Sequence, residues 1–179
     1  MSQEIRKTHR VFMAWEYTQE EKWLNRMSKS GWQLIKGGCF SQKFVKDDAH
    51  QYCIRLDYKK MPAGKEADRY IETFEEQGWE HLNSTFNNWH YFRKQIREGE
   101  PESAYEIYTD MESVQEMMNR WKRLAYGCSA ALLILSIVYI YLYAVSGFMF
   151  YWISIGVFLI MLIWLLANTR KMNADRHME

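Results

Sequence analysis

Apolar residues alternate with polar ones in two short stretches, residues 11–17 and 52–58, and both stretches end in an acid followed by a tyrosine. This period of two predicts a β-strand at each place. Helical spacing of apolar residues follows each stretch, and Thr18 with Glu21 has the pattern of a capping box that begins the first helix. Two further strand-like stretches come after each predicted helix, within residues 32–46 and 79–94.

The dipeptide Gly-Trp occurs twice, forty-seven positions apart, and each copy follows a predicted helix. Gly31 and Gly78 stand where a helix commonly ends in a residue with positive φ. Trp32 and Trp79 come directly after them and are placed to fold back onto the last turn. We therefore interpret Gly31, Trp32, Gly78 and Trp79 as two structural helix stops.

The order strand, helix, strand, strand is thus predicted twice, over about residues 8–47 and 50–96. This pattern predicts an α+β domain over residues 1–98. We expect a duplicated β-α-β-β unit that forms an antiparallel sheet with helices on one side. Two facing sheets are the alternative arrangement.

Residues 124–145 and 147–167 are almost entirely apolar, and no Asp, Glu, Lys or Arg lies between Arg123 and Arg170. Each stretch has about the length that a helix needs to cross a hydrocarbon core of roughly 30 Å. With a turn at Ser146-Gly147, residues 124–167 are predicted to form a two-helix transmembrane hairpin.

Basic residues flank this hairpin on both sides, and the turn carries no charge. They are Arg120, Lys122 and Arg123 before it, and Arg170, Lys171 and Arg176 after it. The positive-inside rule therefore predicts a multi-pass protein of the cell membrane with both termini in the cytoplasm and a cytosolic tail at 168–179. Residues 99–123 are expected to form a linker and an amphipathic juxtamembrane helix. Three arrangements of this helix are compatible with the sequence: it lies on the membrane, it packs against the domain, or it runs straight into the first span.

The net charge of the polar part of the chain limits which partners are expected. Residues 1–118 contain 17 Lys and Arg against 20 Asp and Glu, a formal charge of −3. Nucleic-acid binding requires a concentrated basic face, so no nucleic-acid partner is expected. The N-terminus has no apolar core and is not a secretory signal peptide. Cys39 and Cys53 are interpreted as small buried hydrophobes of a reducing compartment.

Motifs that carry chemistry are not recognised in the sequence. His50 and Cys53 make half of a metal-ligand pattern without a second half at suitable spacing. We find no phosphate-binding glycine loop and no recognisable nucleophile motif. The expectation is therefore a protein that is not an enzyme, with no catalytic residues, no cofactor and no metal.

Aromatic residues are spread over the predicted strands, and six of them form a candidate ligand or partner surface: Trp15, Tyr17, Phe44, Tyr58, Trp89 and Tyr91. A cleft lined by such side chains suits a small apolar or cationic ligand. The alternative is that these aromatics only fill a small core.

The ordered segments FMAWEYTQEEKWLNRMSKSGWQLIK, YCIRLDYKK, YIETFEEQGWE, NWHYFRK and EIYTD resemble a bacterial membrane protein family, domain of unknown function 2812. The resemblance covers about residues 8–112. It implies C-terminal membrane helices, as many members carry, and implies no established activity.

The expected function is a membrane-anchored cytosolic binding or interaction module of a bacterial membrane system. Its partners are expected to be the lipid bilayer and a membrane protein or a second copy of the chain. The alternative is a sensor that binds hydrophobic or cationic small molecules between the two repeats.

Overall fold

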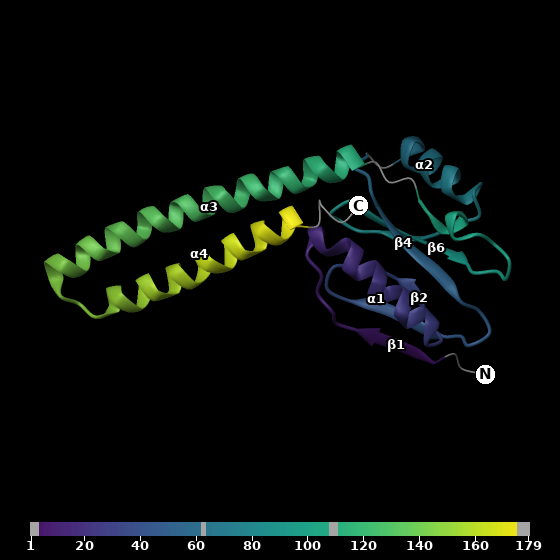
Figure 1. Cartoon of the computed structure of the whole chain (residues 1–179), viewed down its shortest axis with the longest axis horizontal. Coiled ribbons are helices and arrows are strands. Elements are labelled where there is room, and N and C mark those ends of the chain that lie inside the picture. Colours follow the sequence, from purple (N-terminus) through teal and green to yellow (C-terminus); the bar gives the residue numbers. More distant parts are fainter. Residues whose placement is uncertain (1–3, 62–63, 108–110, 175–179) are drawn as a thin grey trace. The chain divides into compact units, whose positions relative to one another are not determined.

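The computed structural model describes residues 4–61, 64–107 and 111–174, without the side chains of Met111 and of residues 171–174 (Figure 1). The chain divides into two compact units, Met1–Val114 and Gln115–Glu179. We call the first unit the body and the second the hairpin unit. The predicted tail at 168–179 lies partly outside the described residues.

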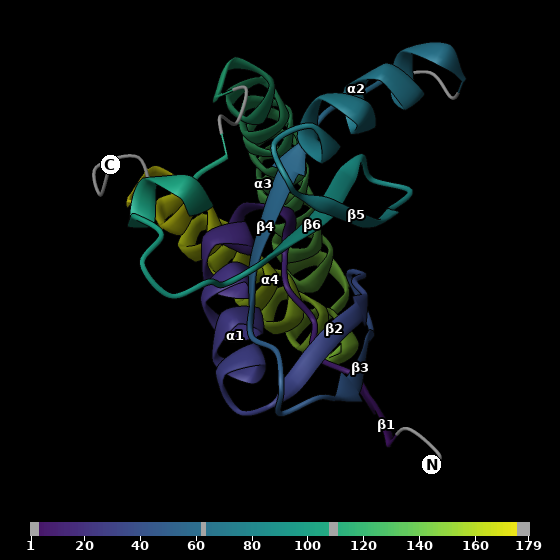
Figure 2. The same ribbon diagram turned by 90° about the vertical axis from the view of Figure 1, so that its right-hand side faces the viewer.

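The body contains two three-stranded antiparallel sheets, and each arises from the element order β-α-β-β (Figure 2). The first half consists of β1 (Ile5–Thr8), a 3₁₀ turn η1 (Ala14–Glu16), α1 (Tyr17–Lys29), β2 (Trp32–Lys36) and β3 (Gln42–Lys46). The second half consists of β4 (Tyr52–Tyr58), α2 (Lys65–Glu75), β5 (Glu80–Ser84) and β6 (Trp89–Gln95), followed by a 3₁₀ turn η2 (Glu102–Tyr105). The strand orders are β1-β3-β2 and β4-β6-β5, so the last strand of each half lies in the middle of its sheet. The predicted α+β class is confirmed, in the arrangement with two sheets.

The strand predicted at residues 11–17 is wrong. The first strand is Ile5–Thr8, and residues 14–16 form a 3₁₀ turn that leads directly into α1. The Glu16 side chain accepts the Met13 N–H at 3.0 Å, and the Glu16 N–H donates to the Met13 carbonyl at 2.8 Å. These two bonds close the turn, and α1 therefore begins at Tyr17. The capping box predicted at Thr18 is also wrong, because Thr18 lies inside the helix.

Both helices of the body end next to a glycine with positive φ, +80° at Gly31 and +81° at Gly78. After α2, the Gly78 N–H donates to the Glu75 carbonyl and the Trp79 N–H donates to the Phe74 carbonyl at 3.0 Å. This pair of bonds is a Schellman motif, which satisfies the last carbonyls of a helix. Trp32 takes different neighbours, since its ring lies under the charged groups of Arg6 and Lys46.

Helix α1 covers the free edge of β4 with a row of polar side chains. The backbone N–H groups of Tyr52, Ile54 and Leu56 point out of the sheet on that edge. They donate to Ser28 Oγ at 2.9 Å, Asn25 Oδ1 at 2.8 Å and Glu21 Oε1 at 2.7 Å, respectively. The residues alternate along the strand and lie one turn apart along the helix, so the two spacings match. An edge strand that would otherwise invite pairing with another chain is thereby satisfied.

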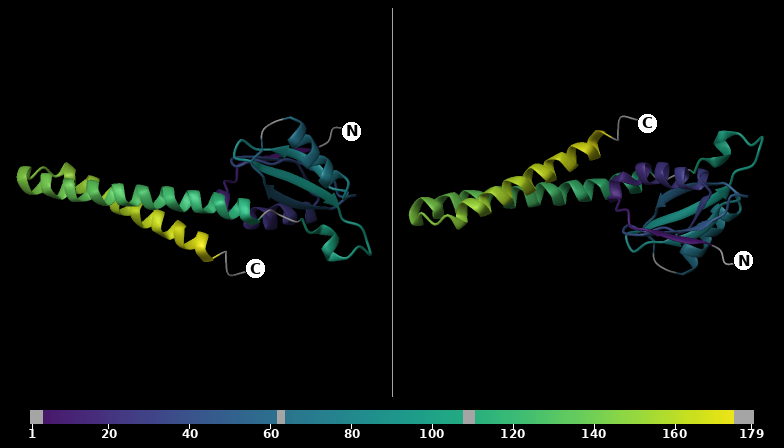
Figure 3. Two further views of the ribbon diagram at one scale, coloured as in Figure 1. Left: turned by 90° about the horizontal axis from the view of Figure 1, so that it is seen from above. Right: turned by 90° about the horizontal axis from the view of Figure 1, so that it is seen from below.

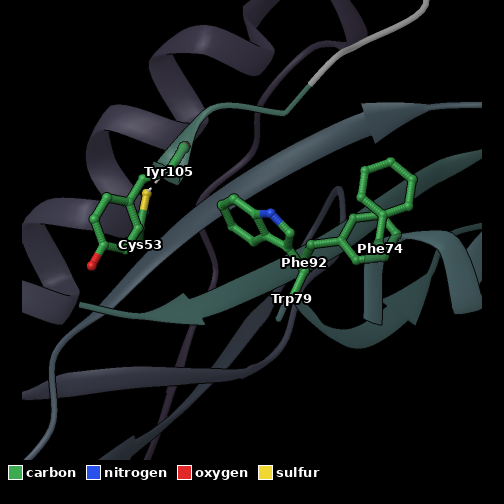
Figure 4. Packing of buried hydrophobic residues seen from close by; sticks show 5 residues of the cluster. All are labelled: Cys53, Phe74, Trp79, Phe92 and Tyr105. Atoms are coloured by element: carbon green, nitrogen blue, oxygen red, sulfur yellow. Dashed lines mark hydrogen bonds between the residues drawn. The ribbon is translucent and has the colours of Figure 1, made fainter. Parts of the chain in front are cut away.

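Aromatic side chains make up much of the core. Figure 4 shows one cluster of five buried residues: Cys53, Phe74, Trp79, Phe92 and Tyr105. Phe74 and Phe92 stack at 4.3 Å between ring centroids. The cluster joins the end of α2 and the start of β5 to the central strand β6 and to η2. The helix stop at Trp79 therefore also contributes to the core of the second half.

The hairpin unit consists mainly of two long helices, α3 (Met111–Ser146) and α4 (Phe150–Ala174), which lie side by side in Figures 1 and 3. Helix α3 is uninterrupted, so the predicted juxtamembrane helix runs straight into the first span. The two helices contact each other through Tyr139 and Phe158, whose ring centroids are 5.4 Å apart. Hydroxyls within the helices donate to their own backbone, as Ser129 does to the Ala125 carbonyl and Ser136 to the Leu132 carbonyl. These two hydroxyls are thus satisfied without water, as a bilayer requires.

Both helices are long and apolar enough to cross a membrane. Only 11% and 6% of their most apolar windows are buried, and large side chains such as Ile140, Ile153 and Ile163 lie on the outside. A core helix of a soluble protein would bury most of such a surface. The exposure therefore supports association with a membrane.

Candidate functional site

The six aromatic residues predicted to form a ligand or partner surface are mostly buried. Exposed fractions are 9% or less for Trp15, Phe44, Tyr58, Trp89 and Tyr91, and Tyr17 is half-buried. Three of them form one group in which Tyr17 stacks on Trp89 at 5.1 Å and Tyr58 meets Trp89 edge-on at 5.4 Å. In this conformation they fill the core, and their role in binding stays a prediction.

A concave site lies elsewhere on the body, where the β2–β3 connection faces the β5–β6 connection. We call it the basic groove. Its volume is about 600 Å³, within the range of small-molecule sites. Its lining residues are Lys7, Lys36, Gly37, Gly38, Cys39, Phe40, Ser41, Lys43, Asn83, Ser84, Thr85 and Phe86.

A side-chain amide joins the two halves at the floor of this groove. Asn83 Oδ1 accepts the Gly37 N–H at 2.8 Å, and Asn83 Nδ2 donates to the Gly37 carbonyl at 3.0 Å. Both residues adjoin irregular pairing, since the register shifts between Leu34 and Lys36 in β2 and between His81 and Asn83 in β5. These bulges lie forty-seven positions apart, as the Gly-Trp pairs do. Bulges redirect side chains and are common beside functional sites.

Three lysines form a row across the first sheet at one end of the groove. Lys43 in the central strand β3 is paired with Lys7 of β1 on one side and with Lys36 of β2 on the other. All three are exposed, and the groove lining includes neither aspartate nor glutamate. The local charge is therefore positive, although the body as a whole is acidic.

Two phenylalanines expose their rings at the rim of the groove. Phe40 lies in the β2–β3 connection and is 65% exposed, and Phe86 lies in the β5–β6 connection and is 84% exposed. Both connections are held by polar side chains. Gln42 Nε2 donates to the carbonyls of Gly38 and Arg10, and Thr85 Oγ1 donates to the Trp89 carbonyl. The two rings are therefore presented to solvent by ordered backbone.

A serine and a histidine form a further polar pair at this edge. Ser84 Oγ lies 2.8 Å from His90 Nδ1, and His90 Nε2 lies 3.2 Å from the Lys59 carbonyl. Burial lowers the pKa of His90, so the ring is neutral near pH 7. A neutral imidazole beside a hydroxyl is the geometry of a general base. Because Ser84 and His90 are directly paired across β5 and β6, the contact also satisfies a buried ring within the sheet.

Two glutamates of α1, the buried Glu20 and the half-buried Glu21, lie against strands of the second half. Glu20 accepts the Tyr91 hydroxyl at 2.7 Å, and burial raises the pKa of Glu20 to about 7. Burial also raises the pKa of Glu21 to about 7, although the Leu56 N–H and Arg55 favour its ionised form. Burial raises the pKa of the Cys39 thiol in the groove, so Cys39 stays protonated near neutral pH. Glu20 and Glu21 are held by structural contacts and do not belong to the groove lining, whereas Cys39 does.

Metal-ligating residues do not gather in the described part of the chain: no group of three or more His, Cys, Asp or Glu side chains is placed to hold an ion. His50, part of the half-pattern seen in the sequence, instead lies 2.9 Å from Asp47 through its Nδ1.

The basic groove is not predicted by the pattern of the sequence. Lys7, Lys36 and Lys43 are brought together by strand pairing that includes β1, the strand that the apolar pattern did not predict. A signal that would have helped is the phenylalanine that each strand–strand connection carries, since an apolar residue in a tight connection has no core to enter.

Comparison with known proteins gives one match. The family described as "Protein of unknown function (DUF2812)" matches residues 16–130, which is more than half of the chain. No curated protein matches, and no solved structure matches. The matched region begins at η1, includes both sheets from β2 onwards and ends within α3. The chain therefore belongs to the DUF2812 family of proteins of unknown function.

Proposed function

We propose that this protein is a membrane-anchored binding module that performs no catalysis, with its α+β body in the cytoplasm. The observation that carries the proposal is the exposed, charge-free surface that α3 and α4 present over residues 124–167. Such a surface is stable in hydrocarbon and unstable in water. Basic residues on both flanks of the hairpin support an arrangement with both termini in the cytoplasm.

Binding is assigned to the body, with the basic groove as its site. The groove offers ammonium groups, an amide and hydroxyls, and its lining contains no carboxylate or imidazole. This donor set suits recognition of an anion more than acid–base chemistry.

The second candidate is a small-molecule sensor, which the groove supports because it lies where the two halves meet. The positive charge of the groove changes the ligand that we expect for such a sensor. Three lysines repel a cation, so a sensor using this groove would take an anionic or apolar compound. A membrane protein or a second copy of the chain remains the expected protein partner of the hairpin.

The anchoring is tested by placing a charge in the middle of each helix. Leu135→Lys together with Ile160→Lys should release the full chain from membranes, because a lysine at the centre of a span opposes insertion by about 3 kcal/mol. The measurement is the distribution between pellet and supernatant after alkaline extraction of membranes. Wild type and the body variant Ile96→Lys should stay in the pellet. Wild type in the supernatant would overturn the proposal.

A further inference from the structure

The lysine row has no evident structural use. Lys43 faces a lysine on both neighbouring strands, and like charges directly opposite each other destabilise a sheet. Two other lysines of the body do have partners: Lys46 pairs with Asp48 at 2.6 Å, and Lys94 donates to two backbone carbonyls. Across the described ranges, no ion pair or side-chain hydrogen bond is formed by Lys7, Lys36 or Lys43. The row is therefore a concentration of positive charge that a bound anion would stabilise.

The rim adds an apolar component to this charge. Phe40 and Phe86 come from the two halves of the body and lie in the connections that bound the groove. An exposed phenylalanine is unfavourable in water, and two of them beside one groove form a hydrophobic rim. Cations together with protruding aromatic rings are typical of surfaces that bind anionic membranes, where the rings enter the boundary between headgroups and acyl chains.

We propose that the basic groove binds the phosphate-bearing headgroup of an anionic bilayer lipid, with Phe40 and Phe86 inserted beside it. The proposal rests on the proposed function, because the hairpin of the same chain brings a bilayer within reach of the body. Lys7, Lys36 and Lys43 neutralise the phosphate, and the Ser41 hydroxyl is available to donate to it. A volume of about 600 Å³ accommodates a headgroup. A free anion would use the charge and leave the aromatic rim unexplained, so the bilayer is the favoured source.

The experiment uses the full chain in lipid nanodiscs and measures hydrogen–deuterium exchange of residues 36–43 and 83–88. One disc contains only phosphatidylcholine, and the other also contains phosphatidylglycerol. Exchange in both segments should be about fivefold slower or more in the anionic disc, since each basic residue near an anionic surface favours binding by about that factor. Equal exchange in the two discs would overturn the proposal.

Variants separate charge from general effects. Lys36→Gln with Lys43→Gln should abolish the difference between the discs, and the fold should persist because the change relieves repulsion within the sheet. Lys22→Gln with Lys29→Gln removes the same charge from exposed positions of α1 and should keep the difference. Phe40→Ser with Phe86→Ser should make the difference in exchange between the two discs smaller. An undiminished difference in the groove variant would contradict the assignment.

Two further measurements show whether the ligand is a lipid or a free anion, and which of the two proposals a negative result overturns. Inorganic phosphate added to phosphatidylcholine discs should give little protection, and protection equal to that of the anionic disc would exclude the lipid. A chain that enters discs without any dependence on lipid charge would leave the anchor intact and remove only the groove proposal. A chain that does not enter discs would instead overturn the proposed function.

Discussion

At the scale of single residues, Gly37 shows how closely the two halves approach each other. A Cβ atom at this position would lie 2.2 Å from the nearest atom of the Tyr91 ring, and Tyr91 is buried in the central strand of the second sheet. The contact with Asn83 fixes the backbone of Gly37 from the other side. A side chain there must displace a packed aromatic ring.

Gly37→Ala should therefore lower the free energy of unfolding by about 1–3 kcal/mol, the usual effect of overpacking a core. The measurement is denaturant unfolding of the full chain in neutral detergent, followed by near-ultraviolet circular dichroism. The adjacent Gly38→Ala is the matched control. Its Cβ would meet the Ser41 carbonyl oxygen at 3.1 Å, and a smaller loss is expected. Equal losses for the two variants would argue against the close approach at Tyr91.

Glu20 and Glu21 give the body a dependence on pH. Both pKa values rise from 4.5 to about 7 through burial, so the folded chain keeps protons that the unfolded chain has released. The contribution of these two groups to stability is then highest below about pH 4.5, falls as the pH rises and becomes level above about pH 7. Tyr91 and Arg55 oppose the shift at Glu20 and Glu21, respectively, while Asp57 adds to it at Glu21.

Glu20→Gln should make this slope shallower. The amide oxygen still accepts the Tyr91 hydroxyl, but no buried charge forms when the pH rises. At about pH 8 the variant should melt at a higher temperature than wild type, and at about pH 4 the two should agree. Thermal unfolding at the two pH values measures this, with the exposed Glu72→Gln as the control. A variant that melts lower than wild type at the higher pH would show that the carboxylate stabilises the fold.

At the scale of elements, the contact between α1 and β4 ties the two halves together. Asn25 forms two hydrogen bonds of this contact. Its side-chain oxygen accepts the Ile54 N–H, and its side-chain nitrogen donates to the Ile54 carbonyl at 2.9 Å. Ile54 is fully buried. Water therefore does not readily replace these bonds.

Asn25→Ala should destabilise the body by about 2 kcal/mol or more, because it leaves buried backbone groups of the edge strand without a partner. It should also accelerate amide exchange at Ile54. Gln19→Ala, at an exposed position of the same helix, is the control and should change little. If both variants unfold at the same denaturant concentration, α1 does not protect this edge.

The elements also show what the sequence can and cannot predict. β4 was predicted with its observed bounds, because one face of Tyr52–Tyr58 is apolar and packs into the core. β1 was missed, because Ile5–Thr8 is an exposed edge strand without apolar alternation. The pattern at residues 11–17 resembled a strand, yet Val11 is 54% exposed and residues 14–16 turn into a helix.

For the candidate site too, the sequence predicts one part and not another. The aromatic residues were predicted from their number and position in strands, but the pattern does not distinguish a lined cleft from a filled core. The basic groove depends on which strands are neighbours. Lys7 and Lys43 lie thirty-six positions apart and become a pair only through the register of β1 with β3. Chemistry assembled across strands is therefore visible only once the pairing is known.

At the scale of the whole molecule, the two-helix hairpin was the simplest part to predict. Its signal is a run of uncharged residues that no small soluble body can bury, and α3 and α4 cover nearly the whole run. If the hairpin crosses a membrane, the body needs no basic face of its own to stay there, and residues 1–118 carry a formal charge of −3. In our proposal, the basic groove is an additional contact with lipid and not the anchor.

The central claim is that α3 and α4 cross a bilayer together and hold the body in the cytoplasm. Labelling of intact cells with a membrane-impermeant maleimide tests it, in a chain whose native cysteines are replaced. Ser146→Cys lies at the turn of the hairpin, and Ser103→Cys lies in the body. We expect the first to be labelled in intact cells and the second only after permeabilisation. Labelling of both positions only after permeabilisation, or of Ser103→Cys in intact cells, would contradict the claim.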